Sequence, residues 1–173
     1  MTRRLSWLLL AAFVFGGCVR NEPALPIEPE VEEADLLTVV NVADPRADAQ
    51  LISGFHDLEQ LAWRWTHKRF SVLLQPPEPV EGHPTALEVR LSVPGIVIEQ
   101  LGQISLSASI GGEPVGAQAF SEAGQDLEFR QVVPEGLLAN QPVQVDFELD
   151  KAIEPTANDG RELGVIVSAI QLQ

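Results

Sequence analysis

Two tryptophans two residues apart, Trp63 and Trp65, are the side chains of this sequence best suited to hold a ligand. In a strand, residues i and i+2 share a face, so both indole rings are expected to point the same way. On an open face they would form a flat surface for a sugar ring, with an N–H donor at each rim. On an inner face they would be part of the core. Because large aromatic side chains are highly buried on average, we expect the core position, with the open face as the alternative.

Asp159 and Arg161 form a second candidate site in a loop, with Gly160 between them. As a ligand clamp, the guanidinium would donate two hydrogen bonds to vicinal hydroxyls and the carboxylate would accept from others. As a structural pair, Arg161 would be partly buried and bonded to a carboxylate such as Glu59, which would fix the loop to the fold. We favour the structural role for this arginine and keep the clamp as the alternative.

The sequence carries no spacing typical of an enzyme nucleophile, a phosphate-binding loop, a dinucleotide site or a zinc-protease helix. The three histidines, His56, His67 and His83, show no spacing that would put two imidazoles on one face. A pair of hydrolytic carboxylates leaves no sequence spacing, so that chemistry stays open. We therefore predict a protein that binds and does not catalyse, with no catalytic residue assigned.

Acidic loops are the parts of the chain that would suit a metal ion. The segments Ala43–Asp48 and Asp150–Asp159 offer carboxylates and carbonyls, the hard oxygen ligands that calcium takes. Because the whole surface is acidic, we expect these to be solvated loop acids and predict no cofactor.

Charge and cysteine content exclude several classes of protein. The 173 residues include 11 Lys and Arg against 25 Asp and Glu, a formal net charge of −14. A nucleic-acid partner would need a basic face, so that class is excluded. A single cysteine, Cys18, permits neither an intramolecular disulfide nor a multi-cysteine metal site.

The first residues follow the pattern of a secretory signal. Arg3 and Arg4 are followed by the apolar run Leu5–Phe15, and small residues then lead to Cys18. The apolar run is too short to span a membrane, which takes roughly 20 residues. This end of the segment resembles the lipobox of bacterial lipoproteins, although Phe15 stands where Leu is usual.

The lipobox resemblance implies cleavage after Gly17 and acylation of Cys18, so that residues 1–17 are a signal peptide and Cys18 anchors the protein to a lipid bilayer. An ordinary secretory signal with an incidental cysteine is the alternative. Val19 stands where many inner-membrane lipoproteins have Asp, which favours the outer membrane if the cell is Gram-negative. The implied location is the bacterial cell envelope.

Residues 18–35 are predicted to form a disordered tether behind the lipidated cysteine. Val19 to Asp35 contains three prolines and six acidic residues against one basic residue, with no apolar periodicity. Such a segment cannot build a core and is expected to be extended.

Residues 36–173 are predicted to form an all-β domain, an antiparallel β-sandwich of about eight strands. Several runs alternate apolar and polar residues with a period of two, which indicates one buried and one wet face. The last run is apolar on both faces and is predicted to be a central strand. Gly111-Gly112 fits a two-residue hairpin turn. Pro94–Leu101 and Pro134–Ala139 are each expected to form one helical turn. The expected strands are Leu37–Val42, Arg69–Leu74, Leu87–Val93, Ile104–Ile110, Val115–Phe120, Leu127–Val133, Val143–Leu149 and Leu163–Leu172.

Three short motifs carry a second resemblance. They are Ser53-Gly54-Phe55-His56-Asp57-Leu58-Glu59, Trp63-Arg64-Trp65-Thr66 and Asp159-Gly160-Arg161-Glu162-Leu163-Gly164. In this order they resemble a jelly-roll module associated with bacterial surface-polysaccharide enzymes and lipoproteins, similar to galactose-binding-like and carbohydrate-binding sandwiches. The resemblance implies an envelope glycan as partner, bound by Trp63 or Trp65 with Asp159 and Arg161. A protein partner in envelope assembly, bound on a sheet face or edge, is the alternative.

Overall fold

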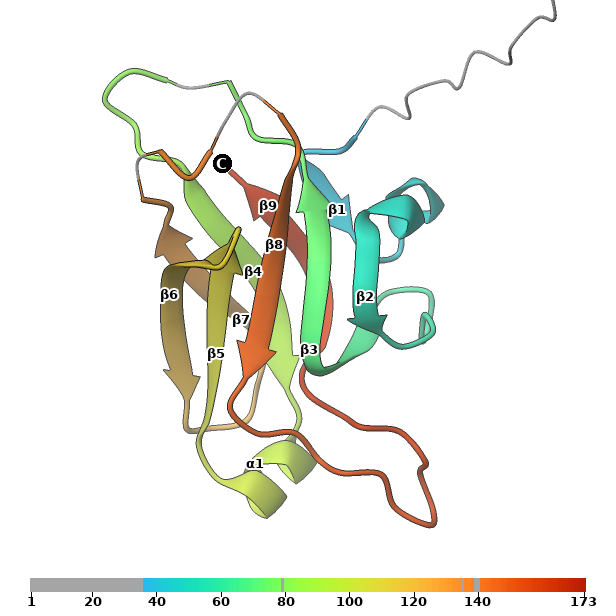
Figure 1. The fold of residues 1–173 in the computed structure, drawn as a ribbon. Coiled ribbons are helices and arrows are strands. Elements are labelled where there is room, and N and C mark those ends of the chain that lie inside the picture. The colour runs from blue at the N-terminus through green and yellow to red at the C-terminus, as the bar shows by residue number, and fades with distance from the viewer. Residues whose placement is uncertain (1–35, 79, 135, 139–140) are drawn as a thin grey trace, which may run out of the picture. The chain divides into compact units, whose positions relative to one another are not determined.

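The computed structural model describes residues 36–78, 80–134, 136–138 and 141–173 (Figure 1). The predicted signal peptide, Cys18 and the predicted tether lie outside these residues. The described chain is all-β and antiparallel, as predicted. Its elements are β1 (Val39–Asn41), the 3-10 helix η1 (Pro45–Gln50), β2 (Leu51–Phe55), β3 (Arg64–Leu74), β4 (Ala86–Val93), α1 (Gly95–Leu101), β5 (Ile104–Ile110), β6 (Glu113–Phe120), β7 (Gly124–Val132), β8 (Val143–Leu149) and β9 (Ile166–Leu172).

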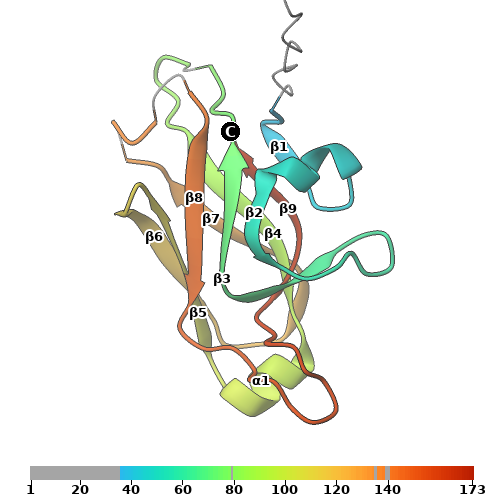
Figure 2. The same cartoon turned by 45° about the vertical axis from the view of Figure 1, so that its right-hand side comes forward.

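The strands form two layers. One layer has the order β2-β3-β8-β5-β6, and the other has β1-β9-β4-β7. Figures 1 and 2 show β4, β7 and β9 behind β3, β8 and β5. This is the sandwich that the alternating runs predicted.

The core lies between the two layers and contains a group of three phenylalanines. Phe70 of β3 and Phe147 of β8 stack with ring centroids 4.7 Å apart, and Phe129 of β7 meets Phe147 edge-on at 6.3 Å. All three side chains are fully buried. Burial of the inner residues of each strand is what holds the layers together.

Strand β3 passes from one layer to the other. Arg64 and Trp65 pair with β9, whereas Arg69–Leu74 pairs with β8 in the opposite layer. Trp65 and Thr66 are consecutive and both buried, so the period of two breaks where β3 crosses between the layers. For this reason the sequence pattern showed only the second half of the strand.

The central position predicted for the last strand is confirmed, but the reason given for it was wrong. β9 pairs with β3, β1 and β4. Arg90 of β4 faces Ala169 while the next residue, Leu91, faces Val167, so Ser168 is an extra residue in a β-bulge. The extra residue shifts the alternation of inward- and outward-facing side chains along β9 by one position. As a result one face carries the fully buried residues Val167, Ile170 and Leu172.

The predicted hairpin turn and the two predicted helical turns have different outcomes. Gly111 and Gly112 form the β5–β6 turn with φ of 59° and 86°, as predicted. Helix α1 confirms a helical turn after Pro94, which precedes the helix and is not its first residue. Among the described residues of Pro134–Ala139 there is a turn at Gly136 and no helix, which corrects that prediction.

Strand β2 was missed because it alternates poorly and contains Gly54. Its pairing with β3 is irregular, with two register shifts. Gly54 has φ of 77°, and a Cβ there would lie 2.0 Å from the Arg69 carbonyl oxygen. The glycine therefore permits a close approach that no other residue allows.

The edges of the two layers offer little regular backbone to which a further strand could pair. Across the gap between β6 and β7, the Gln118 side chain donates to the Glu128 carbonyl at 2.8 Å and accepts from the Arg130 amide at 3.4 Å. The side-chain amide of Gln118 thus makes hydrogen bonds with the β7 backbone of the kind that the backbone of a neighbouring strand would make. Of the other two edges, β1 has three residues and β2 is irregular. Short or irregular edges disfavour strand addition by a partner.

In the part of the chain that the structure describes, no helix has the length and apolar character needed to cross a membrane.

Candidate functional site

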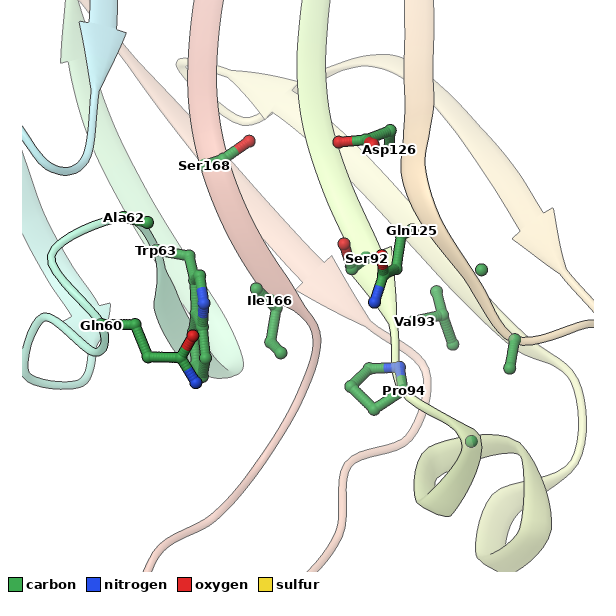
Figure 3. A pocket seen from close by; sticks show the side chains of 13 residues that line it. Gln60, Ala62, Trp63, Ser92, Val93, Pro94, Gln125, Asp126, Ile166 and Ser168 are labelled. Carbon is green, nitrogen blue, oxygen red and sulfur yellow. The ribbon is translucent and has the colours of Figure 1, made fainter.

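A groove of about 810 Å³ opens between the β2–β3 hairpin and the start of α1 (Figure 3). Trp63 forms the wall on the hairpin side, and Pro94 lies on the opposite side, with Ile166 between them. The floor is made by outward-facing residues of β9 and β4, including Ser168 and Ser92. This arrangement brings together residues that are about a hundred positions apart in the sequence.

The hairpin wall is built on a strained turn. Glu59 and Trp63 form an antiparallel bridge, and the Ala62 amide donates to the Glu59 carbonyl at 3.1 Å. The two residues between, Gln60 and Leu61, have φ of 50° and 56°. Positive φ at both central positions is usual for Asn-Gly and costs energy for other residues. The strained turn sets Gln60 beside Trp63 in the groove lining.

Two β-bulges shape the other side of the groove. Opposite Ser92, strand β7 has an extra residue at Gln125-Asp126, and Asp126 has φ of 53°. On the other side of β4, the extra residue is Ser168. Gln125, Asp126 and Ser168 all line the groove. Bulges of this kind redirect side chains and occur often beside binding sites.

All the non-glycine residues with positive φ in the described chain lie at this groove. Gln60 and Asp126 line it, and Leu61 lies between the lining residues Gln60 and Ala62. Strained backbone persists only where the surrounding structure enforces it, and it is concentrated at functional sites. We therefore identify the groove as the candidate functional site.

The lining combines apolar rings with uncharged polar groups. Trp63, Pro94 and Ile166 supply apolar surface, while Gln60, Gln125 and two serines supply hydrogen-bond donors and acceptors. Asp126 is the one charged residue among the lining residues. An indole ring with planar amides around it is suited to a ring that has an apolar face and a rim of hydroxyls.

The two tryptophans have different roles. Trp65 is 8% exposed and belongs to the core, as the favoured alternative predicted. Trp63 is half-buried, packs against the core and exposes its ring to the groove. A surface made of both rings is therefore not formed, and Trp63 alone is accessible to a ligand.

Asp159 and Arg161 form the contacts that the structural alternative predicted. Arg161 Nη1 donates to Glu59 Oε1 at 2.7 Å, and Nε and Nη2 donate to the two Asp159 carboxylate oxygens at 3.0 and 2.9 Å. Neither residue lines the groove. The hydrogen bond from Arg161 lowers the pKa of Asp159 below its ordinary value. Through Glu59, Arg161 positions the hairpin that carries Trp63.

The rest of this loop is fitted closely to β3. Glu162 Oε1 accepts from the Lys68 amide at 2.7 Å, and the Gly164 amide donates to the Thr66 carbonyl at 2.7 Å. A Cβ on Gly164 would lie 2.6 Å from both Thr66 Oγ1 and Leu149 Cδ1. The motif Asp159–Gly164 therefore docks the β8–β9 loop where β3 crosses between the layers.

His56 and His67 are brought together by the fold, contrary to the expectation from their spacing. Their rings stack with centroids 4.2 Å apart, and His56 Nε2 lies 2.7 Å from the Glu162 carbonyl oxygen. The pairing follows from the β2–β3 hairpin, which spacing along the chain does not reveal. His83 is exposed in a separate loop.

The acidic loops use their carboxylates within the protein. Asp44 pairs with Arg46, Asp48 Oδ1 accepts from Arg64 at 2.7 Å, and Asp150 Oδ1 accepts from the Ser105 amide at 2.7 Å. Over the described residues, no three histidine, cysteine or acidic side chains are grouped so as to hold a metal ion.

Sequence reasoning missed the polar residues of the groove, namely Gln60, Ser92, Gln125, Asp126 and Ser168. They lie at bulges and a turn, and no residue type marks these positions in the sequence. The one available signal was Trp63.

No model of a protein family matches the chain, and no curated protein matches it. Among solved structures, an acetyl xylan esterase from the rumen bacterium Butyrivibrio proteoclasticus is similar to 80% of this chain, with 7% identity and a TM-score of 0.43. The chain matches 33% of the esterase. This likeness carries no inference about activity.

Proposed function

We propose that this protein is a lipid-anchored, non-catalytic module that binds glycans of the bacterial cell envelope in the Trp63 groove. The observation that carries the proposal is the gathering of strained backbone around an accessible indole ring. Gln60, Leu61 and Asp126 all have positive φ there.

Sugar recognition fits the chemistry of the lining. A pyranose ring presents C–H groups on its faces, which stack on an indole, and hydroxyls on its rim, which bond to amides and hydroxyls. Trp63 supplies the stacking surface, and Gln60, Gln125 and Ser168 supply partners for the rim. An open groove also leaves space for a chain to continue beyond the bound residue.

The lining supports binding over hydrolysis. Hydrolysis of a glycosidic bond by the common mechanism takes two carboxyl groups that flank it, about 5 to 9.5 Å apart. Asp126 has no second carboxylate among the residues that line the groove.

The proposed location rests on the N-terminus. The basic residues, the apolar run and Cys18 together resemble a lipobox. A multiply acylated cysteine would hold the protein at the membrane surface, and the acidic segment after it would keep the domain off anionic lipid. We favour the outer membrane of a Gram-negative cell.

Binding to envelope oligosaccharides, measured by titration calorimetry and by the shift of tryptophan emission, tests the proposal. Trp63→Ala is expected to remove binding, and Trp63→Phe, which keeps an aromatic face, is expected to retain part of it. Ile52→Ala is the matched control, because Ile52 is an exposed apolar residue on β2 outside the groove lining. Binding that survives Trp63→Ala, or no binding to any envelope oligosaccharide, would contradict the proposal.

A protein partner is the second candidate, favoured by two exposed apolar side chains. Leu61 is 84% exposed and Ile96 is 45% exposed, and each follows a residue that lines the groove. Leu61→Ser separates the two candidates. It is expected to abolish binding of a protein partner while Trp63-dependent binding of a sugar persists.

A further inference from the structure

We propose that the binding surface continues from the groove along the outer face of β4, β7 and β9 to Arg90 and Glu128, so that the ligand is a linear oligosaccharide without a net negative charge. The inference rests on the proposed function and names the class of ligand.

The strand register places the second part of the surface next to the groove. On β4, Ser92 lines the groove, and Arg90 is two residues further along the same face. Arg90 lies opposite Glu128 on β7 and opposite Ala169 on β9. Two residues along a strand span about 7 Å. Ser168 connects the two parts, since its hydroxyl donates to the Arg90 carbonyl at 3.4 Å and its side chain lines the groove.

Arg90 and Glu128 are exposed, and neither side chain forms an ion pair with any of the described residues, although their backbones are directly paired. The small side chain of Ala169 beside Arg90 leaves the guanidinium uncovered on that side. A free guanidinium and a free carboxylate can each form hydrogen bonds to hydroxyl groups.

Two residues before Arg90 on the same outer face, Glu88 is bonded to neighbouring side chains of the protein, and the proposed surface ends there. Glu88 is buried, forms an ion pair with Arg130 and accepts from the Gln171 side chain at 2.8 Å. A second amide, from Gln173, bonds to its other oxygen. These polar groups are satisfied within the protein, so they offer a ligand little.

Charge decides between kinds of oligosaccharide. The surface has Asp126 and Glu128 against one cation, Arg90, and the whole chain has a formal net charge of −14. A glycan rich in uronic acids would be repelled by this field, whereas neutral and amino sugars would not.

The test uses the purified full-length protein in detergent on an array of neutral, amino-sugar and uronic-acid oligosaccharides, each from monosaccharide to hexasaccharide. Binding is expected for neutral or amino sugars, with affinity that rises from the monosaccharide to the trisaccharide. Arg90→Ala is expected to lower affinity for the trisaccharide about tenfold, the loss of one charged hydrogen bond, and to leave the monosaccharide unchanged. Arg69→Ala, an exposed arginine in the other layer, is the matched control.

The outcomes separate the two proposals. Binding that depends on Trp63 but is equal for all lengths and unaffected by Arg90→Ala would overturn the extended surface and leave the proposed function standing. Preferential binding of uronic-acid chains would overturn the ligand class. If no oligosaccharide binds, or Trp63→Ala has no effect, both proposals fail.

Discussion

Single residues at the groove hold conformations that their side chains disfavour. Gln60 and Leu61 occupy the central positions of a tight turn with positive φ, where Asn and Gly are usual. Their side chains are both exposed, so core packing does not explain why these residue types occupy the turn. We interpret the strain as a cost to folding that is retained because Gln60 faces the site.

Replacing the turn with Gln60→Asn and Leu61→Gly should therefore stabilise the protein and weaken ligand binding. Relief of the two positive-φ positions is expected to raise the free energy of unfolding by about 1–2 kcal/mol. Urea denaturation measures this gain, and titration calorimetry with an oligosaccharide that binds the wild-type protein measures the loss of affinity. A variant with no gain in stability would show that the turn is not strained.

The Asp159 carboxylate gives a pH dependence to stability. Its pKa is lowered from the ordinary 3.8 because Arg161 donates hydrogen bonds to it. Its contribution is therefore fully present above the unfolded-state pKa and is lost as pH falls through the lower folded-state pKa. Unfolding of wild type and Asp159→Asn, followed over a pH series, should differ above pH 3.8 and converge below it. A difference in stability between the two proteins that is the same at every pH would contradict this role of the Asp159 carboxylate.

Among the secondary-structure elements, β3 and β9 organise the molecule. β3 belongs to both layers, and β9 joins β3 to β4. The loop before β9 is tied to the β2–β3 hairpin through Arg161 and Glu59, and to β3 itself through Gly164. The groove lies beside this junction, so its walls depend on elements that the junction holds in place.

Gly164→Ala is expected to destabilise this junction. The new Cβ would lie 2.6 Å from Thr66 Oγ1 and Leu149 Cδ1, and 2.8 Å from the His67 carbonyl oxygen, so the backbone must move. Overpacking of this kind costs about 1–3 kcal/mol, measurable by urea denaturation. Gly160→Ala is the matched control, because a Cβ there meets no atom within 4 Å. Equal stability of the two variants would argue against a close junction.

At the scale of the whole molecule, the prediction concerns the anchor. Cys18 is the single cysteine and follows an apolar run closed by two glycines. Cys18→Ala is expected to prevent acylation and cleavage after Gly17. Partition into detergent and the mass of the mature chain measure the two effects. A Cys18→Ala protein of mature size that still enters the detergent phase would refute the anchor.

The sequence by itself determined the all-β class and most strand positions, because alternation along a strand is a local property of the chain. The central place of the last strand was predicted correctly from its many apolar residues, although a bulge, and not two buried faces, explains their pattern. It also suggested a carboxylate such as Glu59 as the partner of Arg161, since a partly buried arginine needs one. The tertiary structure decided the rest. The exposure of Trp63 and burial of Trp65 depend on where β3 crosses between layers. The stacking of His56 on His67 depends on the hairpin register, and the groove depends on a turn and two bulges that meet around Ser92. Bulges and crossings interrupt the period of two, so they leave no pattern in the sequence, and only the packed sheets show which side chains they bring together.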